Sequence, residues 1–311
     1  MTYAKPAKLS LALRIAKDFK RNRGIYLMLI PVILYYALFH YGPMYGAQIA
    51  FRDFVPARGI EGSAWVGWDN FKEFFNGIYF WRLLRNTLAI SLLDVLFGFP
   101  APIVLAILLN EVTSQKFKRL VQTTSYMPFF ISVVVIVGLL IDFFARDGLV
   151  NNVLGRTGDG RIGFLSEPNY YWALYVGSGI WQTFGYGSII YLASISSIDP
   201  QLYDAAKVDG AGRFRQIFNI TLPGIAPTIM TLFILRIGAM LSIGSEKTIL
   251  LYNPLVYQTA DIISSYVFRN GVLNGDYSLS AAVGIFNSII NLALLFTANS
   301  LSRRRGGTSL F

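Results

Sequence analysis

The sequence contains no cysteine and a single histidine among its 311 residues. Without cysteine, the chain can form no disulfide, thiolate metal site or thiol nucleophile. His40 has no second imidazole to join it, and neither H-E-x-x-H nor G-x-S-x-G occurs. We therefore expect no metal centre and no catalytic residue, and His40, among aromatic neighbours in an apolar stretch, is expected to have a packing or interface role.

A nucleotide site is also missing from the sequence. No G-x-x-x-x-G-K-[ST] phosphate loop is present, since Lys247 and Thr248 lack the preceding glycines. Gly158, Gly160 and Gly163 match G-x-G-x-x-G, but no strand is predicted before them, which removes the context that dinucleotide binding needs. The chain is therefore expected to hold no cofactor of its own.

Charged residues are scarce as well. They make up 14% of the chain, whereas 54% is hydrophobic, and the mean hydropathy of +0.50 is too high for an ordinary soluble domain. The net charge of +10 comes from Lys and Arg gathered at the ends of apolar blocks. This pattern indicates membrane topology rather than a basic face for nucleic acid, so the expected environment is a lipid membrane.

Six apolar runs approach the roughly 20 helical residues that cross a bilayer. They are 26–50, 84–109, 120–144, 171–195, 222–243 and 279–301. The sequence thus predicts an all-α integral membrane protein with six transmembrane helices.

The distribution of Lys and Arg predicts the orientation. Of the 27, 16 lie in the first set of connections and termini, which is 1–24, 110–119, 197–222 and 302–311. Ten lie in the second set, which is longer in total and comprises 51–85, 145–170 and 244–278; Arg236 lies within the fifth run. Positive residues favour the cytoplasmic side, so we expect both termini in the cytoplasm.

The two ends of the chain are basic. Residues 1–24 carry seven Lys and Arg with apolar residues at helical spacing, which fits either a helix lying on an anionic membrane surface or a solvated tail. Residues 302–311 form a short basic tail.

The polar segment 202–223, between the fourth and fifth runs, has the pattern of two short helices. Asp204, Ala205 and Ala206 lie in its first half, and Phe214 begins a series of apolar residues at helical spacing in its second. Gly210, with Gly212 after it, allows a tight bend between the halves.

This segment resembles the EAA motif of permeases of binding-protein-dependent ABC importers. The residues that carry the resemblance are Asp204-Ala205-Ala206, Asp209-Gly210-Ala211, Phe214 and Leu222-Pro223. Asp204 stands where the family usually has Glu, so the charge is kept on a shorter arm. The resemblance extends from about Tyr26 to the C-terminus, and IPVILYYALFHYGPMYG and LLYNP look like the sugar and complex-saccharide branch.

The resemblance implies a type I ABC importer permease fold in the bacterial inner membrane. It divides the chain into the basic segment 1–24, a first transmembrane helix and outer loop at 25–85, a transmembrane core at 86–301 and the tail. It also implies a second, similar permease subunit, two ATPase subunits that bind ATP and Mg, and an external substrate-binding protein. The segment 202–223 would be the cytoplasmic coupling helix, held in a cleft of the ATPase.

The same resemblance gives roles to the residues of the segment. Asp204 would pair with a cation of the ATPase, Phe214 would fill its cleft, Gly210 would allow the bend, and Pro223 would start the fifth transmembrane helix.

Arg236 is a charge inside a predicted transmembrane helix. Such an Arg costs roughly 2.5 to 3.5 kcal/mol on insertion scales, so it should face a cavity or a partner. It could line the pore and contact substrate, or form a structural ion pair, for which Asp94 and Asp142 are candidate partners. The sequence leaves both interpretations open.

The fourth run carries aromatic residues, an amide and several glycines. Trp181, Gln182 and Tyr186 are of the types that stack on sugar rings and bind hydroxyls, although for any one of them a packing role is the better interpretation. Together with Arg236 they predict a path for an oligosaccharide, with an acidic one such as a uronate or alginate oligomer as a hypothesis. The alternative function is a membrane-embedded enzyme that modifies glycans or lipids.

Overall fold

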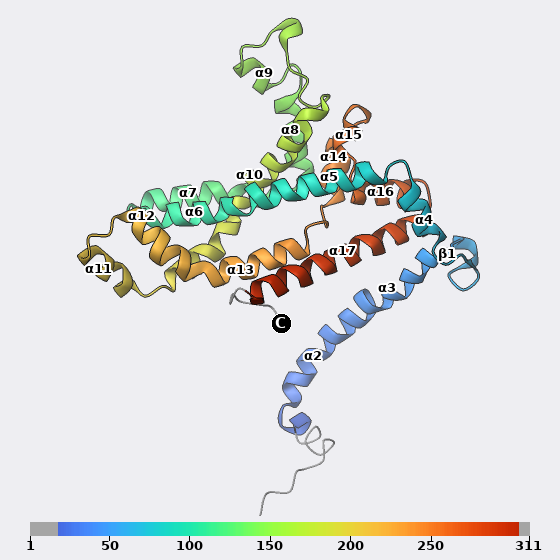
Figure 1. Ribbon diagram of the computed structural model, residues 1–311, viewed down its shortest axis with the longest axis horizontal. Coiled ribbons are helices and arrows are strands. Elements are labelled where there is room, and N and C mark those ends of the chain that lie inside the picture. Colours follow the sequence, from blue (N-terminus) through green and yellow to red (C-terminus); the bar gives the residue numbers. More distant parts are fainter. Residues whose placement is uncertain (1–17, 305–311) are drawn as a thin grey trace, which may run out of the picture.

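The computed structural model describes residues 18–304, and its described part is built almost entirely of helices (Figure 1). The predicted all-α fold is confirmed. The expected surface helix or tail at 1–24 and the tail at 302–311 fall largely outside the described residues. The long helices are α2 (Arg23–Tyr36), α5 (Phe80–Leu93), α6 (Pro100–Glu111), α7 (Gln115–Tyr126), α8 (Val133–Phe144), α10 (Pro168–Ser196), α13 (Leu222–Gly238) and α17 (Tyr277–Arg304).

Four helical stretches of the described chain are long and apolar enough to cross a membrane. They are Arg23–Phe51, Phe80–Glu111, Arg213–Gly238 and Tyr277–Arg303. Three of them cover a predicted run in full, whereas the one predicted over 222–243 ends at Gly238. Helix α10 covers another and has 29 residues, but its Gly, Ser, Asn and Gln residues leave it less apolar than these four.

The third predicted run is not one straight helix. It consists of two helical stretches, Gln115–Phe130 and Val133–Val153, which meet at an angle of 101°. The two stretches are long and apolar enough to cross a membrane only when they are taken together. The break follows the 3₁₀ turn Met127–Phe130, and Ser132 then caps α8 by accepting a hydrogen bond from the Val135 amide at 3.4 Å. A Ser cap starts a new helix direction, which accounts for the bend.

Short elements connect the long helices. The first span continues from α2 through the π-helical turn Ala37–Tyr41, α3 (Gly42–Met44) and the 3₁₀ helix Tyr45–Phe51 to an antiparallel pair of two-residue strands, β1 (Arg52–Asp53) and β2 (Ala64–Trp65). The remaining helices are α4 (Asp69–Asn76), α9 (Leu149–Val153), α11 (Pro200–Val208), α12 (Arg213–Gln216), α14 (Ser245–Leu251), α15 (Tyr257–Ala260) and α16 (Ile263–Phe268). Helix α4 lies in the connection between the first two spans.

The core lies where α10 packs on α5 and α6 and where α13 packs on α17 (Figure 1). One cluster of buried side chains joins α5, α8 and α10 to the loop helices through Ile90, Val137, Val176 and Ile262, and another joins α6, α10 and α13 through Ile103, Ile195 and Ile225. Helix α2 stands apart from this core and buries none of its side chains. The segment 202–223, which contains most of α11 and all of α12 and is called the connector below, lies at one end of the long axis. Strand β1 and helix α4 lie at the other end (Figure 1).

Candidate functional site

The segment 202–223 forms the predicted pair of short helices, α11 and α12. Helix α11 ends in a pattern in which the amide of Ala211 donates to the carbonyl of Ala206 at 2.8 Å and the amide of Gly210 to that of Lys207 at 3.0 Å. Gly210 occupies the left-handed position of this turn with φ of 72°, which glycine adopts without a steric penalty. The bend expected at Gly210 is present.

The second half of the segment differs from the prediction at Pro223. The fifth span does not begin there, because the helix is continuous from Arg213 through a π-helical turn, Ile217–Thr221, into α13. Proline lacks the amide that a regular α-helix needs, and a π-helical turn beside it changes the local hydrogen-bond register. Leu222 and Pro223 therefore continue a helix that α12 has already started.

Apolar side chains of this connector face solvent. The exposed fractions are 88% for Val208, 80% for Phe214 and 64% for Phe218. Asp204 is also exposed and contacts Lys207 of the same helix at 3.0 Å, whereas Tyr203 reaches the Thr221 hydroxyl at 2.9 Å and fastens α11 to the fifth span. The connector is thus fastened to the fifth span, and its outer face carries exposed apolar side chains that no other part of the described chain covers.

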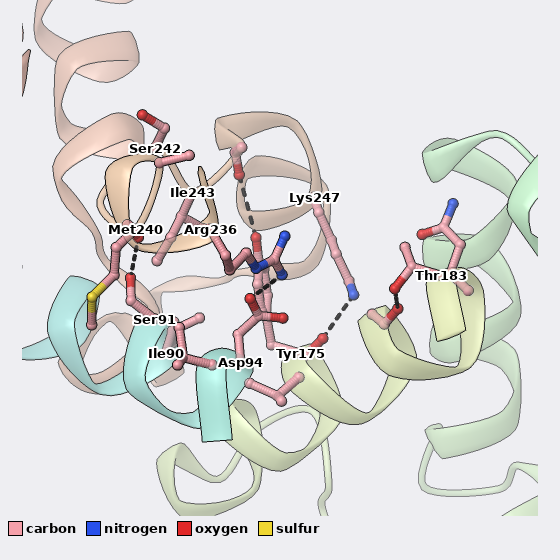
Figure 2. A pocket seen from close by; sticks show the side chains of 16 residues that line it. Ile90, Ser91, Asp94, Tyr175, Thr183, Arg236, Met240, Ser242, Ile243 and Lys247 are labelled. Carbon is pink, nitrogen blue, oxygen red and sulfur yellow. Dashed lines mark hydrogen bonds and ion pairs between the residues drawn. The ribbon is translucent and has the colours of Figure 1, made fainter. Parts of the chain in front are cut away.

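A polar cavity of about 240 Å³ lies among α5, α10, α13 and α14 (Figure 2). Its ionisable lining consists of Asp94, Arg236 and Lys247, apart from one tyrosine. Arg236 donates to the Asp94 carboxylate across the cavity wall. The structure thus gives Arg236 both a cavity and the acidic partner named from the sequence, while Asp142 is not its partner.

Lys247 is the cavity residue that the sequence reasoning missed. Its ammonium donates to the backbone carbonyl of Tyr175 at 2.8 Å and lies 4.6 Å from the centre of the Tyr175 ring. Lys247 follows the fifth apolar run in a predicted loop, where a charged residue is not conspicuous. Only the return of α14 against α8 and α10 brings it to the cavity.

The other candidates for a substrate path do not share one site. Gln182 lines the same cavity as Arg236 and donates to the carbonyl of Ile131 at 3.2 Å. Trp181 lines a separate apolar cavity of about 290 Å³ beside α8. Tyr186 stacks on Phe129 with ring centres 4.0 Å apart.

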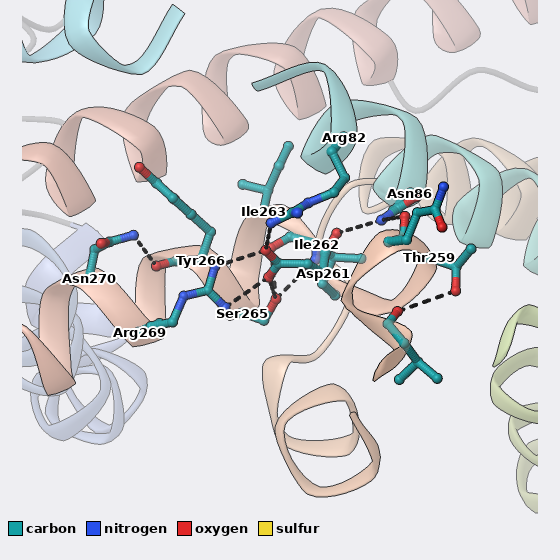
Figure 3. Close-up of polar contacts among 12 residues, drawn as sticks. Arg82, Asn86, Thr259, Asp261, Ile262, Ile263, Ser265, Tyr266, Arg269 and Asn270 are labelled. Carbon is teal, nitrogen blue, oxygen red and sulfur yellow. Dashed lines mark hydrogen bonds and ion pairs between the residues drawn. The ribbon is translucent and has the colours of Figure 1, made fainter. Parts of the chain in front are cut away.

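A second ionic cluster lies near the opposite end from the connector (Figure 3). Asp261 is fully buried and accepts hydrogen bonds from Arg82 at 2.9 Å, Arg269 at 2.8 Å and Ser265 at 2.9 Å. Burial lowers the pKa of the Arg269 guanidinium, but the hydrogen bond and charge of Asp261 outweigh burial and raise this pKa above its usual value. The cluster joins α5 to α16, so it holds the elements beside the cavity in place.

Membrane-length helices surround a polar cavity, and a connector that is fastened to the fifth span but otherwise uncovered lies at one end. This arrangement is that of a membrane permease. Residues 98–307 match the family described as the binding-protein-dependent transport system inner membrane component. The chain belongs to this family, and its fold is that of a type I ABC importer permease.

Proteins similar over nearly the whole length support this assignment. Protein LplB of Bacillus subtilis (strain 168) is 45% identical over 94% of this chain and 92% of its own. The polygalacturonan/rhamnogalacturonan transport system permease protein YteP of the same organism is 43% identical over 94% and 91%. A chain in the crystal structure of the bacterial alginate ABC transporter, in complex with a periplasmic protein bound to an alginate pentasaccharide, is 43% identical with a TM-score of 0.88, and the match covers 96% of this chain and 100% of that one.

Proposed function

We propose that this chain is a permease subunit of an ATP-driven importer for acidic oligosaccharides of the uronate class. It would act in the bacterial inner membrane with six spans and both termini in the cytoplasm. Its partners would be a second, similar permease subunit, two ATPase subunits that bind ATP and Mg, and an extracytoplasmic substrate-binding protein.

The observation that carries the proposal is the likeness over the full length to permeases named for acidic polysaccharides. YteP is named for polygalacturonan and rhamnogalacturonan, and the alginate transporter was crystallised with a periplasmic protein that holds an alginate pentasaccharide. At 43% identity to both, the shared cargo would be a chain of sugar carboxylates.

The cavity supports the same class of substrate. Its charged groups are two cations and one carboxylate, so the lining has an excess of one positive charge. Its volume of about 240 Å³ is below the roughly 300 to 1,000 Å³ typical of a complete small-molecule site. A path shared between two permease subunits would leave each with only part of the wall, which would account for the small volume.

The uncovered helix α2 supports a second permease subunit. None of its side chains is buried, and Leu27, Met28 and Ile33 are each more than 60% exposed. Lipid would cover part of this surface, and helices of a similar subunit would cover the rest.

The connector supports coupling to an ATPase. Apolar side chains as exposed as Val208 and Phe214 favour a partner that buries them. Closure of the ATPases would push on α11 and α12, and the bond from Tyr203 to Thr221 together with the continuous helix from Arg213 would pass the displacement to α13. Arg236 lies on α13, so the same movement would reach the cavity wall.

Uptake by the assembled importer tests the proposal. The complex, reconstituted in proteoliposomes with its binding protein, should accumulate uronate oligosaccharides when ATP is present and not when ATP is absent. Neutral oligosaccharides of equal length should enter much more slowly. ATP-independent uptake, or equal uptake of neutral and acidic oligosaccharides, would contradict it.

A further inference from the structure

The charges that line the cavity differ in how they are neutralised. The Arg236 guanidinium already donates to the Asp94 carboxylate. Among the described side chains of residues 18–304, which leave out Asp159, no carboxylate forms an ion pair with Lys247. The excess positive charge of the cavity is therefore located on Lys247.

The surroundings of Lys247 leave its ammonium available to a ligand. An ammonium has three N–H donors, and one is used by the carbonyl of Tyr175 at 2.8 Å. The Tyr175 ring, 4.6 Å away, offers a cation–π contact that compensates only partly for lost hydration. A half-buried ammonium that contacts only a carbonyl and an aromatic ring has lost part of its hydration without gaining a counter-charge. An anion that binds to it would form a charge-assisted hydrogen bond and lower its free energy.

Gly179 keeps the space beside this ammonium open. A Cβ atom at position 179 would lie 3.6 Å from Lys247 Nζ, so any larger side chain on that face of α10 would compete with a ligand for the same place. Figure 2 shows Lys247 on the opposite side of the cavity from Met240, with Arg236, Asp94 and Tyr175 between them.

We propose that Lys247 is the residue of the translocation path that binds the carboxylates of the substrate, while Arg236 is kept neutralised by Asp94. The inference rests on the proposed function, because it requires a uronate substrate. An ammonium is a compact charge without the fixed planar geometry of a guanidinium. It can therefore hold successive carboxylates without requiring one orientation, which suits a chain that must keep moving.

The test uses the intact importer in proteoliposomes and one uronate oligosaccharide in two forms, the free acid and the methyl ester. The variants are Lys247→Gln and Lys247→Arg, with Glu246→Gln as the matched control. Glu246 is the preceding residue of α14, is exposed and does not line the cavity. The binding protein is the same throughout, so its own preference cancels when each variant is divided by the wild type on the same substrate.

Lys247→Gln should lower uptake of the acid about tenfold, as expected for one charge-assisted hydrogen bond, and should change uptake of the ester by much less. Lys247→Arg keeps the charge but has the planar guanidinium geometry, so it should lose less uptake than Lys247→Gln. Glu246→Gln should stay close to the wild type. Equal losses on both substrates, or no loss on the acid, would overturn the role of Lys247. If the wild-type importer does not transport the ester at all, the comparison depends on the acid alone. In that case the role of Lys247 is overturned if Lys247→Gln and Lys247→Arg lose equal amounts of uptake of the acid.

Failure of the proposed function would be visible separately. In that case the wild-type importer itself would not prefer the uronate, whichever residue stands at position 247.

Discussion

The charged residues of this chain form two groups. Some are neutralised by oppositely charged partners inside the helical bundle, and others are exposed at its surface. Asp261 belongs to the first group, since it is buried between Arg82 and Arg269. Asp204 belongs to the second, since it is exposed and its ion pair is with Lys207, which is also exposed. Exposed pairs of this kind contribute little to stability, so the role of Asp204 is expected in a complex.

Replacing Asp204 by Ala should uncouple transport from ATP hydrolysis. In the assembled importer the carboxylate would pair with a cation of the ATPase, and breaking one side of a pair that becomes buried is costly. We expect uptake to fall roughly tenfold or more, with ATP hydrolysis by the complex retained. Lys207→Ala is the control, because it removes only the partner within α11; the assignment fails if this variant loses as much uptake as Asp204→Ala.

The pair formed by Asp94 and Arg236 should behave as a unit. Asp94→Asn or Arg236→Gln leaves one charge unpaired, whereas the double variant leaves none. Because both side chains are partly exposed to the cavity, the effect should be modest, with each single variant lowering the Tm of the purified protein by roughly 2 to 4 °C. The double variant should recover most of this loss, and a sum of the two single losses would show that the residues act independently.

Among the structural elements, the turn of the connector depends on one backbone conformation. Gly210 has φ of 72°, and a Cβ atom added there would have no neighbour within 4 Å, so Gly210→Ala would introduce backbone strain of about 1 to 2 kcal/mol and no clash. We expect reduced uptake with Gly210→Ala and a smaller reduction with Gly210→Asn. Gly212, with φ of −68° and equally open space, is the matched control, and a comparable loss in Gly212→Ala would refute the role of the turn.

Helix α10 lies close against α7 at Gly185. A Cβ atom there would lie 1.9 Å from the backbone carbonyl oxygen of Ser125, so the two helices would have to separate. Gly185→Ala should destabilise the purified protein by about 1 to 3 kcal/mol, measured as a lower Tm. Gly177, on the same helix with no neighbour within 4 Å, should accept Ala without loss, and equal Tm values for the two variants would contradict this packing.

The sequence predicted these elements well where apolar length alone decides them. The runs 84–109 and 279–301 correspond to Phe80–Glu111 and Tyr277–Arg303. It missed the 101° bend near Ser132 and the early start of the fifth span at Arg213. A Ser cap and a π-helical turn depend on local hydrogen bonds that hydropathy does not register.

For the molecule as a whole, the site was only partly predictable. Arg236 and Asp94 could be named because charges are conspicuous in apolar runs. Lys247 and Asp261 could not, because both lie between the fifth and sixth runs and reach the interior only when that connection folds back onto α5, α8 and α10. Their burial is a property of the tertiary fold and not of the local sequence.

The arrangement of the whole molecule underlies the proposed coupling. The connector with α11 and α12 occupies one end of the long axis, and the loop elements α4 and β1 occupy the other (Figure 1). If the first end faces the cytoplasm, an ATPase can hold the connector while a binding protein reaches the opposite end.

Accessibility of the connector from each side of the membrane tests this coupling most directly. The chain has no cysteine, so single variants Val208→Cys and Ile78→Cys would carry the only thiol of this subunit at positions that are 88% and 85% exposed. With a membrane-impermeant thiol reagent, Val208→Cys should react only in inside-out vesicles and should be protected when the ATPase subunits are bound, while Ile78→Cys should react only in right-side-out vesicles. Labelling of Val208→Cys from the outside, or labelling from the inside that the ATPases leave unchanged, would contradict the proposed coupling.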